Sequence, residues 1–167
     1  MHHQDSQRHM TALDLDRATP LLRRAYDYWT AKCGTRPMPA RADLDPAEIK
    51  PLLSNLILMD VLRDAKPGWP LDFRYRLVGT NVDAMMNGRY TGLCMSEMPH
   101  QQPGSRIWSS LERVTATRQP HINRVPYVGP HKDFISVVDM VMPLSNDGGE
   151  VNMLFCIVDF VLRARLA

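Results

Sequence analysis

The segment 71–92, LDFRYRLVGTNVDAMMNGRYTG, constrains the fold of this chain more than any other. Residues 73–77 alternate apolar side chains with arginines, which is the period-two pattern of a half-buried strand. The pattern changes at Gly79, after which residues 80–86 place valine and two methionines on one face of a short helix. A strand that leads straight into short helices with apolar faces predicts a sheet covered on one side, and such a cover can enclose a pocket.

Bulk composition narrows the class of protein. The length of 167 residues and the apolar content of 44% predict one globular domain that can bury a core without disulfides. A net charge of +2, spread along the chain, argues against a nucleic-acid partner, and no apolar run approaches the ~20 residues of a membrane helix. The three cysteines lack any CxxC spacing, and the polar N-terminus lacks a secretory signal, so we expect a cytoplasmic protein without a membrane partner.

Residues 1–18 are expected to be mobile, and a flanking helix is predicted over residues 19–34. Thr19 can cap this helix and Pro20 can begin it. One face of the helix is apolar and packs either on its own domain or on a second copy of the chain, and the pattern leaves both open. We expect a homodimer, for which the candidate contacts are Leu22, Ala25 and Trp29.

The main domain is expected over residues 35–163. Turn-forming residues connect the first predicted strand to the second and the fourth to the fifth, so these pairs are hairpins and the sheet is antiparallel. The helices lie in one connection, between the second and third strands, and should therefore cover one face of the sheet. The fold class is α+β. The five predicted strands are 55–62, 71–78, 121–128, 134–144 and 151–161, and the longest connecting helix is 105–118.

This order of elements resembles the PAS fold, and the likeness extends to short motifs. The motifs are YW at 28–29, PARADLDP at 39–46, FRYRLVGT at 73–80, GRYTG at 88–92 and MPLSNDG at 142–148. Together they resemble a PAS-like family of short, single-domain bacterial proteins, found mostly in alphaproteobacteria. The resemblance covers about residues 20–160 and implies the sheet order 2-1-5-4-3. It also implies a role in sensing or protein docking rather than in catalysis.

The interior between the sheet and its covering helices is either a filled core or a cavity for a small molecule. Dense packing is usual in small domains, so a filled core is favoured. The strand register at 134–144 cannot be read from the sequence, and either alternate set of side chains can face the helices. If a cavity exists, the candidate ligand-binding residues are Tyr75, Leu77, Met85, Trp108, Leu111 and Met140.

Asp139 interrupts the apolar segment VVDMVM. It is either an outward polar residue or a buried acid, and a buried acid normally has a partner, which Arg74 or Arg76 on the sheet could supply. We therefore expect these three residues to have structural or docking roles. No catalytic residue is expected, because no nucleophile or second acid is placed beside Asp139.

The chain is expected to carry no metal, haem or flavin. Haem requires an axial ligand, and helix 105–118 contains no histidine. Flavin-binding light sensors of this fold carry cysteine in a segment like GxNCRFLQ, whereas TGLCMSEM has Cys94 without the asparagine, arginine and glutamine. A corner formed by His121, His131 and Asp133 lacks the closely spaced histidine pair that is typical of metal sites.

These patterns predict a PAS-like sensory or signalling protein that binds a small ligand, docks a protein partner, or does both. The alternatives are an adaptor that docks proteins without a ligand, and an enzyme that uses the same cavity. Ligand-dependent stabilisation distinguishes the sensor from the adaptor.

Overall fold

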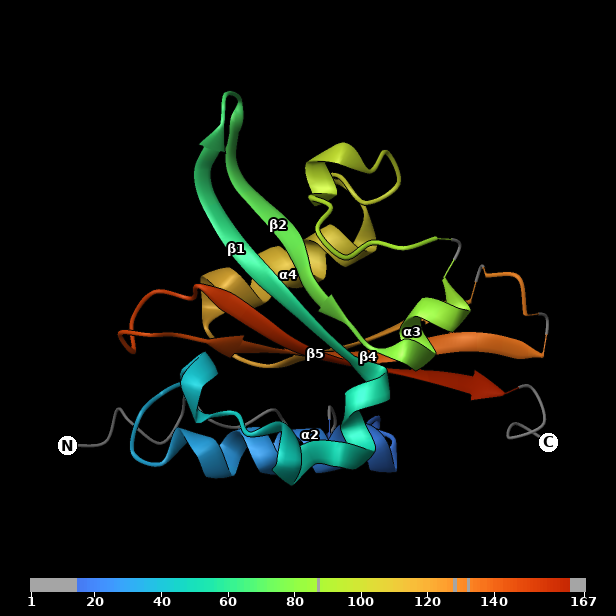
Figure 1. The fold of residues 1–167 in the computed structure, drawn as a ribbon, viewed down its shortest axis with the longest axis horizontal. Helices are drawn as coiled ribbons and strands as arrows, with labels where there is room; N and C mark the ends of the chain where they lie inside the picture. The colour runs from blue at the N-terminus through green and yellow to red at the C-terminus, as the bar shows by residue number, and fades with distance from the viewer. Residues whose placement is uncertain (1–14, 87, 128, 132, 163–167) are drawn as a thin grey trace.

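The computed structural model describes residues 15–86, 88–127, 129–131 and 133–162. Most of the segment predicted to be mobile, residues 1–14, lies outside these ranges. None of the described helices is both long and apolar enough to cross a membrane. In chain order the elements are α2 (Pro20–Cys33), η1 (Arg41–Asp43), η2 (Pro46–Asn55), β1 (Leu56–Lys66), β2 (Trp69–Val78), α3 (Thr80–Met85), η3 (Met95–Glu97), α4 (Arg106–Thr117), β3 (His121–Pro126), β4 (Phe134–Leu144) and β5 (Met153–Leu162) (Figure 1).

The five strands form one antiparallel sheet in the order β2-β1-β5-β4-β3. The α+β class, the antiparallel sheet and its strand order are therefore as expected. The hairpin of β1 and β2 is longer than the sequence predicted, because Lys66 still pairs with Trp69 and the turn contains only Pro67 and Gly68. The central strand β5 joins this hairpin to β4, so strands far apart in the sequence share one core.

Helix α2 covers one face of the sheet, and α3, η3 and α4 lie over the other (Figure 1). Thr19 caps α2 by accepting a hydrogen bond from the backbone N–H of Leu22 (3.4 Å). The apolar stripe of α2 packs on its own sheet, where the indole of Trp29 donates to the carbonyl oxygen of Pro143 (2.9 Å). Leu22, Ala25 and Trp29, the candidate dimer contacts, are at most 2% exposed, and this packing leaves them no surface for a partner.

Strand β2 contains a β-bulge that the sequence pattern did not reveal. Met59 on β1 pairs with Tyr75, but its neighbour Leu58 pairs with Leu77, so Arg76 is an extra residue on β2. The extra residue reverses the alternation of side chains beyond it. Tyr75 points toward the helices α3 and α4, whereas Leu77 lies on the opposite face and is 41% exposed.

The structure also decides the register of β4, which the sequence left open. Asp139 pairs with Asn123 on β3 and with Val158 on β5. Val137, Asp139 and Val141 face α4, and the alternate residue Met140 faces α2 with no exposed surface. The side chains of β4 that are available to a ligand are therefore those of the odd-numbered residues.

Candidate functional site

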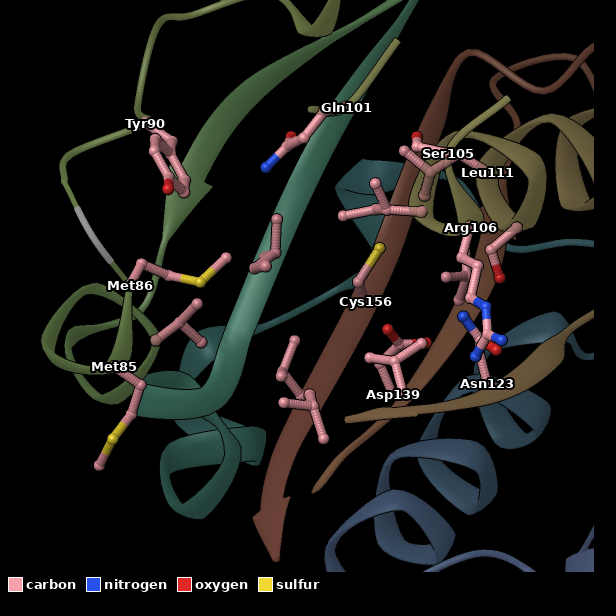
Figure 2. A pocket seen from close by; sticks show the side chains of 18 of the residues that line it. Met85, Met86, Tyr90, Gln101, Ser105, Arg106, Leu111, Asn123, Asp139 and Cys156 are labelled. Atoms are coloured by element: carbon pink, nitrogen blue, oxygen red, sulfur yellow. The ribbon is translucent and has the colours of Figure 1, made fainter. Parts of the chain in front are cut away.

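A cavity of about 660 Å³ lies between the sheet and the helices α3 and α4 (Figure 2). The prediction of a filled core on this side is therefore wrong. The sheet contributes short side chains here, including Val141, Cys156 and Val158, which do not reach across to the helices. Larger apolar side chains complete the wall: Met59, Met85, Met86, Ile107, Leu111 and Phe160.

Asp139 is the acidic group in the cavity wall. The residue as a whole is half-buried, and its Oδ1 atom is fully buried. That atom has no hydrogen-bond partner among the residues that the structure describes. Burial raises the pKa of Asp139 to about 7, since removal from water disfavours the charged carboxylate.

The two arginines expected to pair with Asp139 pair with Asp60 instead. The Nε and Nη2 atoms of Arg74 donate to Asp60 Oδ2 at 3.1 and 2.9 Å, and Nη1 of Arg76 lies 3.7 Å from the same oxygen. Asp60 and Arg74 are direct neighbours on β1 and β2, on the face turned away from the cavity. The predicted pairing of Asp139 is wrong, because the β4 register turns its side chain toward α4.

Ser110 and Asn123 are polar lining residues that the sequence reasoning missed. Ser110 is buried on α4, and its Oγ atom has no hydrogen-bond partner within the described part of the chain. Its position in the apolar stripe of α4, beside Leu111, is a signal that could have identified it. Asn123 could not have been found this way, because only the pairing of β3 with β4 brings it beside Asp139.

Tyr75 occupies a different part of the wall, on β2. Its hydroxyl donates a hydrogen bond to Gln101 Oε1 (2.6 Å), and its ring lies 5.6 Å from that of Tyr90. Burial raises the pKa of this phenol, so Tyr75 is neutral at physiological pH. Tyr75 thus joins the sheet to the segment between η3 and α4 across one side of the cavity.

A second connection holds the segment after β3 against α3. The hydroxyl of Tyr127 donates to the carbonyl oxygen of Met85 (3.0 Å), and the His131 ring lies 3.1 Å from the carbonyl oxygen of Ala84. A Cβ atom on Gly129 would collide with the Tyr127 hydroxyl and with Met85 O, so the close approach requires glycine. Tyr127 and Gly129 thus line the cavity beside Met85 of α3.

Three of the six predicted ligand-binding residues line the cavity: Tyr75, Met85 and Leu111. The other three do not. The β2 bulge turns Leu77 away, and the β4 register turns Met140 toward α2. Trp108 lies on the α4 stripe but packs edge-on against Phe73 (4.9 Å between ring centroids), and its Nε1 donates to Glu112. The ligand-binding role of the three lining residues stays a prediction.

The residues weighed for metal or flavin chemistry, His121, His131, Asp133 and Cys94, are not among those that line the cavity. The described residues contain no group of three or more histidine, cysteine, aspartate or glutamate side chains placed to hold a metal ion. Cys94 is buried and does not line the cavity. Its backbone forms an isolated antiparallel β-bridge with that of Arg74. The expected absence of haem and flavin stays a prediction.

The sheet order and the cavity under α3 and α4 agree with the similarity found by comparison. A family model described as a PAS domain matches residues 17–158, which is most of the chain. No curated protein and no solved structure gives a significant match. The narrower resemblance to alphaproteobacterial proteins stays a prediction. Because the family model spans the chain from α2 into β5, which is most of its length, this chain belongs to the PAS domain family.

Proposed function

We propose that this PAS domain is a cytoplasmic sensory module that binds a small, mainly apolar molecule in the cavity. The observation that carries the proposal is the cavity itself. Its volume of about 660 Å³ lies within the range of roughly 300–1,000 Å³ typical of ligand sites. Its wall is mostly aliphatic and sulfur-containing, with a few polar groups, which is the usual composition of a site for small molecules.

Occupancy of the cavity would be transmitted through the segments that cover it. The hydrogen bonds from Tyr75 to Gln101 and from Tyr127 to Met85 attach these segments to each other and to the sheet. A ligand that fits one arrangement of these contacts better than another shifts the conformational population of the protein toward that arrangement. We propose that the signal leaves by contact with a signalling protein or a second copy of the chain, and a native mass measurement tests the homodimer.

A thermal-shift screen of small apolar molecules tests the sensor. Ligands of the cavity should raise the melting temperature of the wild-type protein in a concentration-dependent way. The variant Val158→Phe should abolish these shifts by filling the cavity from β5. The variant Ile157→Leu is the matched control, because its side chain lies on the opposite face and keeps its volume. Equal shifts in both variants would place the binding elsewhere.

A ligand-free docking module is the second candidate, and Leu77 is the observation that favours it. This side chain is 41% exposed and borders a separate groove of about 520 Å³ between η2 and the β1–β2 hairpin. If docking on this groove is the function, Leu77→Glu should abolish complex formation with the partner, and Val158→Phe should leave it intact. If the sensor proposal holds, Val158→Phe should abolish ligand binding and Leu77→Glu should leave it intact.

The proposal is binding without turnover. Conversion of a bound molecule to product by the wild-type protein, lost in Asp139→Asn, would show instead that the cavity is an active site. Product analysis by mass spectrometry of any ligand found in the screen makes this distinction.

A further inference from the structure

Two residues that line the cavity each have a buried polar atom without a hydrogen-bond partner in the described part of the chain. Asp139 Oδ1 lies on β4 and Ser110 Oγ lies on α4, and both are without a hydrogen bond among the described residues. A buried polar group that lacks a partner destabilises the fold, so native proteins contain few of them. These two atoms lie on β4 and α4, which face each other across one cavity. Their placement indicates that their hydrogen-bond partner is a molecule bound between them.

Asn123 adds a third polar group at the same end of the cavity. It is the direct cross-strand neighbour of Asp139, and Figure 2 shows the two side chains close together beside Arg106. The side-chain oxygen of asparagine, like those of serine and aspartate, accepts hydrogen bonds. The surrounding wall is apolar, with Val137 and Val141 flanking Asp139 on β4. This end is therefore an acceptor-rich patch in an otherwise hydrophobic site.

No described cation neutralises Asp139. Arg106 lines the same end of the cavity, but the residue is exposed and makes no ion pair of 4.0 Å or less with Asp139. Burial raises the pKa of Asp139. Solvent screens an exposed guanidinium, whereas a cation placed inside the cavity would act on Asp139 at short range.

We propose that the cavity takes an amine with an apolar body, whose ammonium group donates hydrogen bonds to Asp139, Ser110 and Asn123. An ammonium group has three donors, which matches three acceptors supplied by β4, α4 and β3. The apolar body extends toward Met85 and Leu111. This inference rests on the proposed function, because it names the ligand class of the same site.

The proposal predicts a specific dependence of affinity on pH. The bound ammonium favours the carboxylate form of Asp139, so amine affinity should rise by about tenfold as Asp139 ionises between pH 6 and pH 8. The titratable or charged groups that line the cavity with Asp139 are Tyr75, Tyr90, His100, Arg106, Tyr127 and Cys156. His121 on β3 and Arg113 on α4 line an adjoining pocket with Ser110 and Asn123. Tyr75 and Cys156 stay neutral in this range because burial raises the pKa of each.

The test compares three probes that share one apolar body: 3-phenylpropylamine, 3-phenylpropanol and 3-phenylpropanoate. Isothermal titration calorimetry on the full chain at pH 6 and pH 8 measures each affinity. The amine should bind at least tenfold more tightly than the alcohol at pH 8, and the alcohol should show no pH dependence. The variants His100→Gln and His121→Gln should each keep the pH dependence of the amine, which attributes that dependence to Asp139 rather than to a histidine.

Substitutions locate the head group. Asp139→Asn should weaken the amine roughly 10- to 100-fold, because a charge-assisted hydrogen bond is lost, and should leave the alcohol unchanged. Ser110→Ala should weaken the amine by a smaller factor. The control is Asp159→Asn on β5, since Asp159 pairs with Val138 and lies outside the cavity lining.

Each of the following three outcomes would overturn the assignment of an amine as the ligand. Equal affinities for all three probes would show a cavity without head-group selection and would leave the sensor proposal standing. Tightest binding of 3-phenylpropanoate would make Arg106 the recognition group. Failure of all three probes would overturn the amine, and the wider thermal-shift screen would then decide separately whether the cavity binds any ligand.

Discussion

The two faces of the β4–β5 pair carry different side chains and produce different interiors. Toward α2, the paired residues are Met140 with Ile157 and Met142 with Phe155, and all four are completely buried. Toward α4, Val141 pairs with Cys156 and Asp139 pairs with Val158. The larger residues fill the space under α2, whereas the smaller ones leave a cavity of about 660 Å³ under α4. The β4–β5 pair thus has a filled face under α2 and a hollow face under α4, which are the names used below. The groove beside Leu77 lies next to this filled region, between η2 and the β1–β2 hairpin.

The faces also differ in how their polar groups are satisfied. On the filled face, the buried indole of Trp29 donates to Pro143 O, so its polar atom is paired. On the hollow face, Asp139 Oδ1 and Ser110 Oγ are unpaired within the described residues. Paired groups and dense packing stabilise a fold, and unpaired groups beside a cavity reduce its stability but are available to a ligand. We therefore expect the filled face to contribute most to the stability of the fold and the hollow face to bind the ligand.

The strongest test of this contrast is Trp29→Ala on the filled face. It should lower the free energy of unfolding by roughly 3–5 kcal/mol, because it creates a cavity in a packed core and leaves Pro143 O without its donor. Urea denaturation measures the loss. The matched change on the hollow face is Leu111→Ala, which should lose only about 1–2 kcal/mol because the side chain already borders empty space. Equal losses would contradict the contrast.

Asp139→Asn should increase stability on the hollow face, and the gain should depend on pH. The pKa of Asp139 is about 7 in the folded protein, and that of an unfolded aspartate is about 3.9. The folded state therefore loses stability as pH rises from about 4 to 7, and the penalty is complete above pH 7.

At pH 8 the Asn variant should gain roughly 2–4 kcal/mol, and at pH 5 less than half of that. Urea denaturation at the two pH values gives both numbers, with Asp159→Asn as the control. A gain that is the same at pH 5 and pH 8 would show that Asp139 has no raised pKa. A loss at pH 8 would show that its carboxylate is paired.

Adding the same ring to two adjacent residues of β5 compares the faces directly. Ile157→Phe should lower stability by about 1–3 kcal/mol, because it overfills the dense side. Val158→Phe should change stability by less than about 1 kcal/mol, because the ring enters the cavity. Denaturation curves of the two single variants are sufficient, and a larger loss at position 158 would show that the cavity cannot accept the ring.

Arg74→Gln should have the smallest effect, because its ion pair with Asp60 is partly exposed. The expected loss is at most about 1 kcal/mol and should shrink at high salt. Arg76, at 3.7 Å from the same carboxylate, retains part of the interaction. Ligand affinity should not change, since the pair faces away from the cavity, and a changed affinity would indicate that the two sides of the sheet are coupled.

The sequence allowed prediction of the features that depend on local patterns. Alternation at 73–77, together with apolar runs bounded by turn residues, located the strands, and the Thr19-Pro20 start with an apolar stripe located α2. The strand order came from the resemblance, which the family match supports. Three features could not be predicted this way: the β2 bulge at Arg76, the β4 register, and the choice of surface for α2. Each depends on which residues pair or pack across space.

The candidate site shows the same limit. Tyr75, Met85 and Leu111 were correctly grouped because their own elements carry a clear apolar face. Leu77 was misplaced by one inserted residue, since a shift of one position moves a side chain to the other face of a sheet. Asp139 was identified as an unusual acid, but its partner was wrongly assigned. Arg74 and Arg76 lie on β2, which β1 and β5 separate from β4, and both pair with Asp60 on β1.

The sequence by itself determined the class of fold and the identity of the unusual groups, because alternation, capping and turn residues act over a few positions. It also determined that valine and cysteine alternate with methionine, phenylalanine and isoleucine on β4 and β5. Only the tertiary structure decided which of these sets meets α2 and which meets α4, because strand register depends on pairing between distant segments. This register places the larger side chains under α2, leaves a cavity under α4, and places Asp139 in the wall of that cavity.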